Sequence, residues 1–184
     1  TFMDDLKNSG GMLNPLLEKV KRDKTLMMAI REESINIYYR GGSLLRLDRK
    51  PNGVYPAKFD THYNISKLPV PDYPKVITSR EDSLRWVEVF PAFKNMMDEF
   101  LSEHEKLERE FQQVVVRENN DSPISGRTEY FITDIELDEK EDHARFDLTG
   151  IRWLAGDRKD GSKCRAVLME MKYGEGSLGG ESGI

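Results

Sequence analysis

The hydrophobic pattern near the C-terminus predicts a strand that is apolar for most of its length and polar at its end. Four apolar residues occupy positions 166–169, and Glu170, Met171 and Lys172 follow them. A continuous apolar run of this length is typical of a strand that is buried on both faces. Because strand side chains alternate between faces, Glu170 and Lys172 share one face at the polar end. The pattern therefore predicts a carboxylate and an ammonium side by side at the edge of an apolar sheet.

Two other strand-like segments precede this strand along the chain. Residues 129–137 alternate between apolar and polar positions, residues 144–153 are also strand-like, and a charged turn connects the two. Strands joined by short polar turns are expected to pair as antiparallel neighbours. The C-terminal part of the chain therefore predicts three antiparallel strands, followed by a Gly-rich segment at 174–183.

A long helical pattern covers residues 79–118 and precedes all three strands. Ser79 followed by Asp82 is typical of a capping box, with Asp in place of the usual Glu or Gln. Apolar residues recur at helical spacing in the second half of the segment, which predicts a face that packs on a sheet. Pro91 lies inside the pattern, and we expect it to kink the helix or to split it in two.

Residues 15–30 also predict a helix. Asn14 is suited to cap it and Pro15 fits its first turn, although Asp23 and Lys24 interrupt the apolar spacing. The helix carries a basic run, for which a solvated face is the simpler interpretation and a phosphate contact is the alternative. The run consists of Lys19, Lys21, Arg22 and Lys24.

Two β-rich runs follow this helix, and they flank Gly41-Gly42. A Gly-Gly pair between such runs is a strong hairpin signal, and Asn52-Gly53 indicates a third returning strand. The predicted strands cover residues 35–40, 43–48 and 54–60. Tyr38 and Tyr39 lie in the first strand, where one ring is expected to face the core and the other the solvent. Stacking of these rings on nucleic-acid bases is the alternative.

Proline-rich residues 61–78 predict an extended connector between two parts of the chain. We therefore expect an N-terminal module at 1–78, made of a helix, a β-hairpin and this connector, and a core domain at 79–184. The chain starts at Thr1 without a methionine and stops just after the Gly-rich segment. Both features are compatible with a fragment of a longer protein.

Composition narrows the class of protein. The chain has 184 residues, of which 38% are hydrophobic and 33% charged, and its net charge is −5. This balance is typical of a soluble globular protein and argues against a uniformly basic nucleic-acid surface. A single cysteine, Cys164, excludes an internal disulfide framework and a multi-cysteine zinc site. The sequence shows neither a membrane-spanning stretch nor a secretion signal, so we expect a cytoplasmic location.

Asp147 adds a second carboxylate to the predicted polar strand end. It lies in the strand before Glu170 and has apolar neighbours. A carboxylate in such surroundings is costly unless a cation meets it, and Lys172 alone leaves the pair of carboxylates net acidic. A hard cation such as Mg²⁺ completes a site of this kind.

The order of these elements resembles the core of the PD-(D/E)xK nucleases, the restriction-endonuclease-like superfamily. The resemblance covers residues 79 to the C-terminus, and its motif is Asp147 followed, after 22 residues, by Glu170-x-Lys172. It implies an α+β, sandwich-like fold in which a mixed β-sheet is flanked by helices. Here the N-terminal helix and hairpin module precedes that core. Phe146 replaces the proline of the motif's name, a position that carries no chemistry.

The resemblance also implies roles for individual residues. Asp147, Glu170 and the backbone carbonyl of Met171 would hold one or two Mg²⁺ ions, with Mn²⁺ as a substitute, and Lys172 would position and polarise the attacking water. A glutamate of the preceding helix often joins the metal ligands. Glu110 is the first candidate for that role and Glu108 the second.

The implied function is Mg²⁺-dependent hydrolysis of nucleic-acid phosphodiester bonds, with DNA expected over RNA as the partner. Cations near the motif that could contact phosphates are Arg152, Lys163 and Arg165. We expect no membrane partner, and the oligomeric state stays open, with a dimer as one alternative. The family core continues into a second helix and strand, so we expect this core to be truncated at the C-terminus.

Two other interpretations remain open at this stage. In one, the domain is a catalytically inactive nuclease-fold module that binds nucleic acid or a partner protein through its N-terminal part. In the other, Glu170 and Lys172 form a structural ion pair in an unrelated α+β protein, because such triplets often occur by chance on exposed strands.

Overall fold

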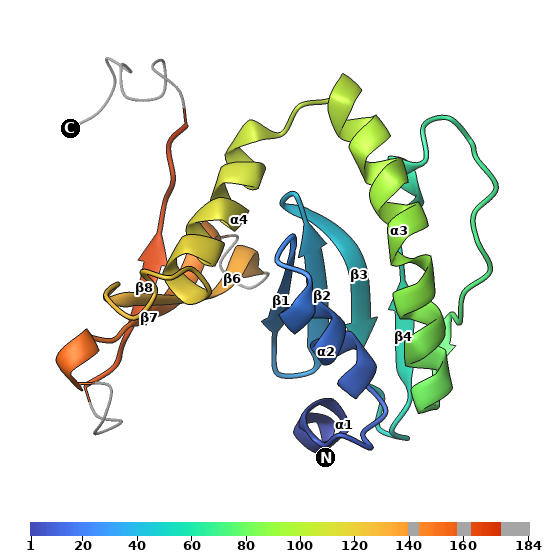
Figure 1. The fold of residues 1–184 in the computed structure, drawn as a ribbon, viewed down its shortest axis with the longest axis horizontal. Helices are drawn as coiled ribbons and strands as arrows, with labels where there is room; N and C mark the ends of the chain where they lie inside the picture. Colours follow the sequence, from blue (N-terminus) through green and yellow to red (C-terminus); the bar gives the residue numbers. More distant parts are fainter. Residues whose placement is uncertain (140–143, 158–162, 174–184) are drawn as a thin grey trace. The chain divides into compact units, whose positions relative to one another are not determined.

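A computed structural model describes residues 1–139, 144–157 and 163–173 of the chain. The described residues form a mixed α+β protein with four α-helices and two antiparallel sheets (Figure 1). The chain divides into two compact units, Thr1–Glu105 and Lys106–Ile184. The sequence predicted a boundary between residues 78 and 79, whereas the long helix after that point belongs to the N-terminal unit. Each unit is described by itself below.

The N-terminal unit contains a five-stranded sheet in which every strand pairs antiparallel with its neighbour along the chain (Figure 1). Three helices accompany it, α1 (Phe2–Lys7), α2 (Asn14–Arg22) and α3 (Arg80–Glu103). The strands are β1 (Leu26–Ile30), β2 (Ser34–Tyr39), β3 (Gly42–Asp48), β4 (Tyr55–Lys58) and β5 (Val76–Ile77).

The predicted hairpin is present between β2 and β3. Its turn contains Arg40 at φ 49° and Gly41 at φ 73°, two successive left-handed residues of the kind that a tight hairpin turn requires. Gly42 is needed for a different reason, because a Cβ atom there would lie 2.6 Å from the Tyr63 hydroxyl and from the end of Met97. Tyr38 is buried and Tyr39 is half-buried, as the core interpretation of this pair predicts.

The predicted helix over residues 15–30 is wrong in its second half. Helix α2 ends at Arg22, and residues 26–30 form strand β1 instead. The side chain of Asp23 accepts hydrogen bonds from the N–H and the hydroxyl of Thr25, at 3.2 and 2.6 Å, which stabilises a turn where the helix would have continued. The apolar residues Met27 and Met28 then pack as part of the sheet.

Helix α3 supplies the large aromatic residues of the core. Trp86, Phe90 and Phe93 are fully buried, and the Phe93 ring stacks on Phe59 with centroids 4.1 Å apart. The indole N–H of Trp86 donates to the carbonyl of Pro74 at 2.9 Å, so the proline-rich connector is fixed to the helix. This connector also contains a short 3₁₀ helix at Thr61–Tyr63 and strand β5, in addition to extended chain.

The start of α3 confirms the predicted capping box. Ser79 Oγ accepts the N–H of Asp82 at 3.2 Å, and Asp82 Oδ2 accepts the N–H of Ser79 at 3.1 Å. Pro91 does not split the helix, because α3 runs through this residue to Glu103. The helical region breaks instead at residues 104–106, and α4 (Leu107–Asn120) begins a separate helix.

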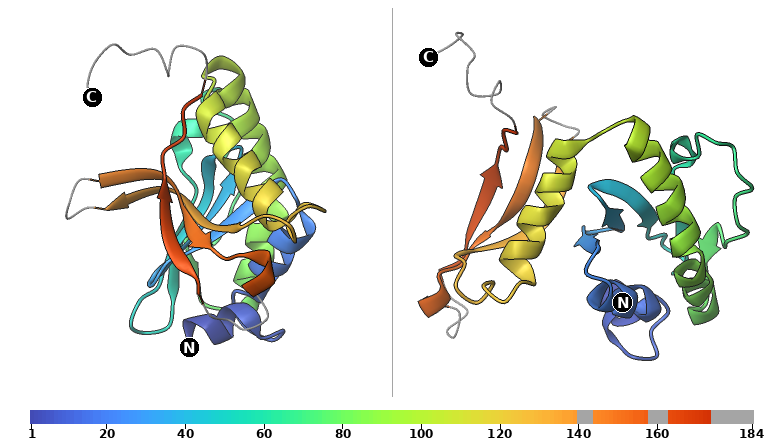
Figure 2. Two further views of the ribbon diagram at one scale, coloured as in Figure 1. Left: turned by 90° about the vertical axis from the view of Figure 1, so that its left-hand side faces the viewer. Right: turned by 45° about the horizontal axis from the view of Figure 1, so that its top comes forward.

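The C-terminal unit consists of α4 and a three-stranded antiparallel meander (Figure 2). Its strands are β6 (Tyr130–Glu139), β7 (Ala144–Arg152) and β8 (Arg165–Met169), in the order β6-β7-β8. Asn120 joins the end of α4 to the sheet, because its side chain pairs with both the N–H and the carbonyl of Ile132, at 2.9 and 2.7 Å. The predicted helix and three antiparallel strands are therefore present.

Two expectations about this sheet are corrected. The predicted mixed sheet is replaced by antiparallel pairing throughout the part of the chain that the structure describes. The predicted burial of β8 on both faces is also wrong. Within the described residues β8 pairs with β7 alone, and the Leu168 side chain is 58% exposed. The Gly-rich segment 174–183 lies outside the described residues, and within the described ranges no helix has the length and apolar character to span a membrane.

The capping box gives a prediction for stability. Replacing Ser79 with Ala removes the acceptor for the Asp82 N–H, and we expect the free energy of unfolding of the N-terminal unit to fall by about 1 kcal/mol. Urea titration of a Trp153→Phe background measures it, because fluorescence then reports on Trp86 alone. Ser102→Ala, at an exposed position near the end of α3, is the control and should change stability by less than about 0.5 kcal/mol. Equal effects of the two substitutions would contradict the capping role.

Candidate functional site

The two carboxylates of the predicted metal site lie at the end of the β7–β8 ladder. Strands β7 and β8 pair in a register that places Leu148 opposite Met169, and the ladder ends at this pair. Asp147 precedes Leu148 in β7, and Glu170 directly follows the last residue of β8. The structure therefore brings together the two chain segments that carry these acidic residues, which lie 23 positions apart in the sequence.

Asp147 is anchored by the backbone of the segment that follows β8. Its Oδ2 atom accepts the N–H of Met171 at 2.7 Å, in half-buried surroundings. A hydrogen bond to a charged group of this kind contributes about 1.5–3 kcal/mol. The bond holds Met171, whose carbonyl is a predicted metal ligand, next to the first predicted carboxylate ligand. Sequence reasoning missed this contact, because a backbone donor has no sequence signal.

Glu170 is paired with Lys172. Their Oε1 and Nζ atoms lie 2.5 Å apart, and both side chains are about half exposed. The hydrogen bond that Lys172 donates to Glu170 raises the pKa of Lys172 above its ordinary value, and the charge of Glu170 acts in the same direction. The charges of Asp147 and Glu108 raise it further. Lys172 is therefore held in its charged form among three carboxylates.

The first turn of α4 contributes the third of these carboxylates. Glu108 and Glu110 both lie in that turn. Two residues correspond to about 200° around a helix, so the two side chains leave α4 on nearly opposite sides. The charge of Glu108 contributes to the raised pKa of Lys172. Glu110 was the first candidate for the helical glutamate among the predicted metal ligands, and that choice stays a prediction.

The donor set suits a hard cation. Carboxylate and carbonyl oxygens are the ligands that Mg²⁺ prefers, and Mg²⁺ keeps several waters while binding one or two carboxylates. Asp147, Glu170 and the Met171 carbonyl match this chemistry. Among the residues that the structure describes, no group of three histidine, cysteine or acidic side chains lies close enough to hold a metal. In this arrangement Glu170 faces Lys172, so a metal would have to compete with that ion pair.

The predicted phosphate-binding cations lie elsewhere. Arg152 and Arg165 are opposite each other in the β7–β8 ladder, five residues along the strands from Asp147 and Glu170. An odd separation places them on the other face of the sheet, about 17 Å away. Arg152 is also paired with Glu129, through its Nε at 3.1 Å and its NH2 at 2.8 Å. Lys163 lies 3.7 Å from a carboxylate oxygen of Asp157. The structure does not bring Arg152 and Arg165 to the acidic residues.

An aromatic pair lies close to the candidate site and was not predicted as part of it. The rings of Phe111 and Tyr173 are 4.6 Å apart, and their side chains are 46% and 39% exposed. Tyr173 follows Lys172 directly, and Phe111 lies one helical turn after Glu108. The position of Tyr173 beside the Glu-x-Lys triplet is the signal that could have identified it.

Comparison of the chain with protein-family models, with curated proteins and with solved structures found no match. The functional interpretation therefore depends on the geometry of the described residues and on the chemistry of the motif.

The ion pair gives a prediction about protonation. Replacing Glu170 with Gln removes the largest cause of the raised Lys172 pKa, so this pKa should fall toward its ordinary value of 10.5. An NMR titration of the lysine ε-CH₂ signals measures the change. Glu118→Gln is the matched control, because this exposed glutamate of α4 pairs with Arg117. An unchanged Lys172 pKa in the Glu170 variant would show that the ion pair is absent in solution.

Proposed function

We propose that the C-terminal unit hydrolyses phosphodiester bonds of nucleic acid with the help of Mg²⁺. The observation that supports this proposal is the hydrogen bond from the Met171 N–H to Asp147, because Met171 lies between the ion-paired residues Glu170 and Lys172. Two carboxylates and an ammonium at one strand end provide what the reaction needs. They can hold a cation, and they leave a positive charge next to the nucleophile.

Each residue has a separate role in this proposal. Asp147 and Glu170 hold the metal together with the Met171 carbonyl, and Glu108 adds negative charge from α4. The metal, when bound, lowers the pKa of a coordinated water and stabilises charge on the phosphoryl oxygens. Lys172 would orient the attacking water with its ammonium, which in this structure is paired with Glu170. Phe111 and Tyr173 offer exposed aromatic surface on which a base can stack.

The second candidate is a catalytically inactive module of the same fold that binds nucleic acid or a protein. The observation in its favour is the direct Glu170–Lys172 pair, because it engages both groups that the reaction would require. Cleavage and metal binding separate the two candidates.

A cleavage assay tests the proposal. Linear, circular and single-stranded DNA and RNA are incubated with the protein and Mg²⁺ or Mn²⁺. We expect cleavage of at least one substrate class, and we expect Glu170→Gln and Lys172→Met to reduce its rate by about a hundred-fold or more, the scale typical of losing one electrostatic group from such a site. Glu118→Gln should cleave at the native rate.

Two results would contradict the enzymatic proposal. The first is cleavage that survives in both site variants, because the activity would then come from another site or from a contaminant. The second is the absence of cleavage together with the absence of Mg²⁺-dependent thermal stabilisation, which would leave the binding module as the remaining candidate.

A further inference from the structure

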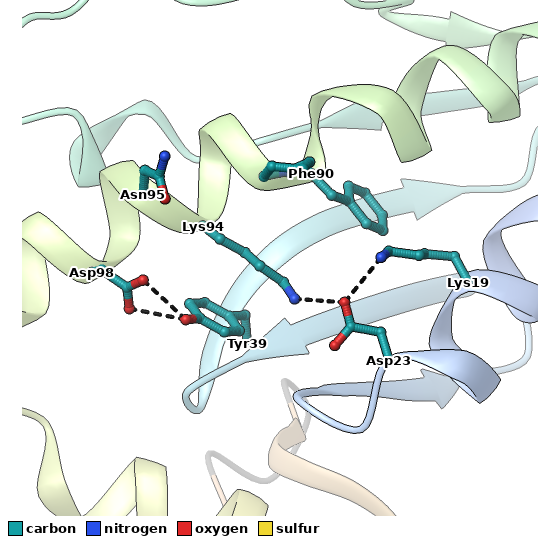
Figure 3. A pocket seen from close by; sticks show the side chains of 8 residues that line it. Lys19, Asp23, Tyr39, Phe90, Lys94, Asn95 and Asp98 are labelled. Atoms are coloured by element: carbon teal, nitrogen blue, oxygen red, sulfur yellow. Dashed lines mark hydrogen bonds and ion pairs between the residues drawn. The ribbon is translucent and has the colours of Figure 1, made fainter.

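The N-terminal unit contains a pocket between α2, the end of β2 and the middle of α3 (Figure 3). Its volume is about 290 Å³, at the lower end of the range for small-molecule sites. No residue of the proposed nuclease site takes part in it. The pocket is lined by Lys19, Asp23, Tyr39, Phe90, Pro91, Lys94, Asn95 and Asp98.

The acidic groups of the pocket are hydrogen-bonded to neighbouring side chains of the same unit. Asp23 accepts two hydrogen bonds from Thr25 on Oδ1, and its Oδ2 lies 2.7 Å from Lys94 and 3.0 Å from Lys19. Burial alone would raise the pKa of Asp23, but the hydrogen bonds from Lys94, Thr25 and Lys19 outweigh it and hold this pKa well below its usual range. Asp23 therefore stays ionised and cannot donate a proton to a ligand.

Asp98 is engaged in the same way. Its two oxygens lie 3.0 Å from the Tyr39 hydroxyl, and one of them accepts Arg40 NH1 at 2.8 Å. Burial of Tyr39, together with this hydrogen bond, raises the tyrosine pKa to about 12, so the phenol keeps its proton. Arg40 also balances the charge of Asp98, which leaves little attraction for a cationic ligand at this end of the pocket.

The cationic groups, in contrast, have hydrogen-bond donors to spare. An ammonium has three N–H donors. Lys94 uses two of them, on Asp23 and on the Thr25 hydroxyl, and its ammonium lies 4.9 Å from the centre of the Tyr39 ring. Lys19 uses one, on Asp23. The amide of Asn95 lines the pocket without a hydrogen-bond partner among the described residues. Figure 3 shows both lysine side chains directed toward Asp23 from different helices.

The net charge of the pocket also favours an anionic ligand. With Asp98 neutralised by Arg40, two ammonium groups face the single carboxylate of Asp23, which leaves one positive charge. Lys94 is only 17% exposed, so a ligand that reaches it meets a partly desolvated cation. Charge-assisted hydrogen bonds are stronger in such surroundings than in water.

We propose that this pocket binds a small oxyanion, inorganic phosphate or a phosphate monoester. The oxyanion would accept the unused N–H groups of Lys19 and Lys94. The volume excludes a large ligand, and the exposed Pro91 provides apolar surface against which the organic part of a monoester can pack. This site is independent of the proposed nuclease site, because all of its lining residues belong to the N-terminal unit.

An NMR titration of the ¹⁵N-labelled protein tests the proposal. Sodium phosphate is added in one series, ribose 5-phosphate in a second, and sodium chloride of equal ionic strength in a third. We expect saturable shifts of the backbone amides of Asp23, Lys94 and Asn95 in the first two series only. Tighter binding of ribose 5-phosphate would identify a monoester as the ligand, and equal binding would identify the free anion.

Two neighbouring lysines of α2 provide a matched pair of variants. Lys19→Gln should raise the dissociation constant about ten-fold, through the loss of one charge-assisted hydrogen bond. Lys21→Gln should leave it unchanged, because Lys21 pairs with Glu18 and does not line the pocket. Asn95→Asp changes an exposed side chain, keeps the internal ion pairs and places a repelling charge in the pocket, so it should abolish binding.

The proposal is overturned if the shifts grow linearly with phosphate concentration without saturating. It is also overturned if the Lys19 and Lys21 variants respond alike, or if Asn95→Asp binds phosphate as the native protein does. In each case the lysines and aspartates would serve only to join α2, β2 and α3.

Discussion

The antiparallel register between β7 and β8 determines what the C-terminal unit can do. It brings the segments that carry Asp147 and Glu170 together at the end of the ladder, where repulsion between like charges is unfavourable unless other groups compensate. The structure shows two such compensations. The N–H of Met171 donates to Asp147, and the ammonium of Lys172 pairs with Glu170. A slip of one residue would move Glu170 to the opposite face and separate the two carboxylates.

This constraint links the fold of the unit to its proposed chemistry. The compensating groups are a backbone donor and a flexible, exposed lysine, and neither cancels the acidity of the site, because Glu108 adds a further negative charge. The carboxylates around Lys172 therefore outnumber its single positive charge. The pocket of the N-terminal unit has the opposite character, since its carboxylates are engaged and its lysines keep free donors. The two units thus differ in the sign of the ligand that each would attract.

The sequence was informative where a local pattern determines the structure. The Gly41-Gly42 hairpin and the Ser79 capping box depend on a few adjacent residues, and both are present. The alternation of apolar and polar residues, together with the short turns, predicted the three-stranded meander. It also predicted that the segments with Asp147 and Glu170 lie next to each other. Because these features are local, no tertiary contact is needed to infer them.

The predictions from the sequence were wrong where contacts between distant residues determine the structure. Met27 and Met28 fit a helix or a buried strand equally well, and pairing with β2 decides for the strand. Pro91 is tolerated within α3, while the break at residues 104–106 carries no proline or glycine signal. The apolar run of β8 indicated burial, although Leu168 is exposed. The pocket could not be predicted, because Lys19 and Lys94 are 75 positions apart.

The most direct test of the metal site is paramagnetic broadening by Mn²⁺ in ¹⁵N NMR spectra. Substoichiometric Mn²⁺ should broaden the amide signals of Leu148, Glu170 and Met171 before any signal of the N-terminal unit, and Asp147→Asn should abolish this effect. Broadening that is spread over acidic surface residues, or that survives in the Asp147 variant, would contradict the assignment of the site.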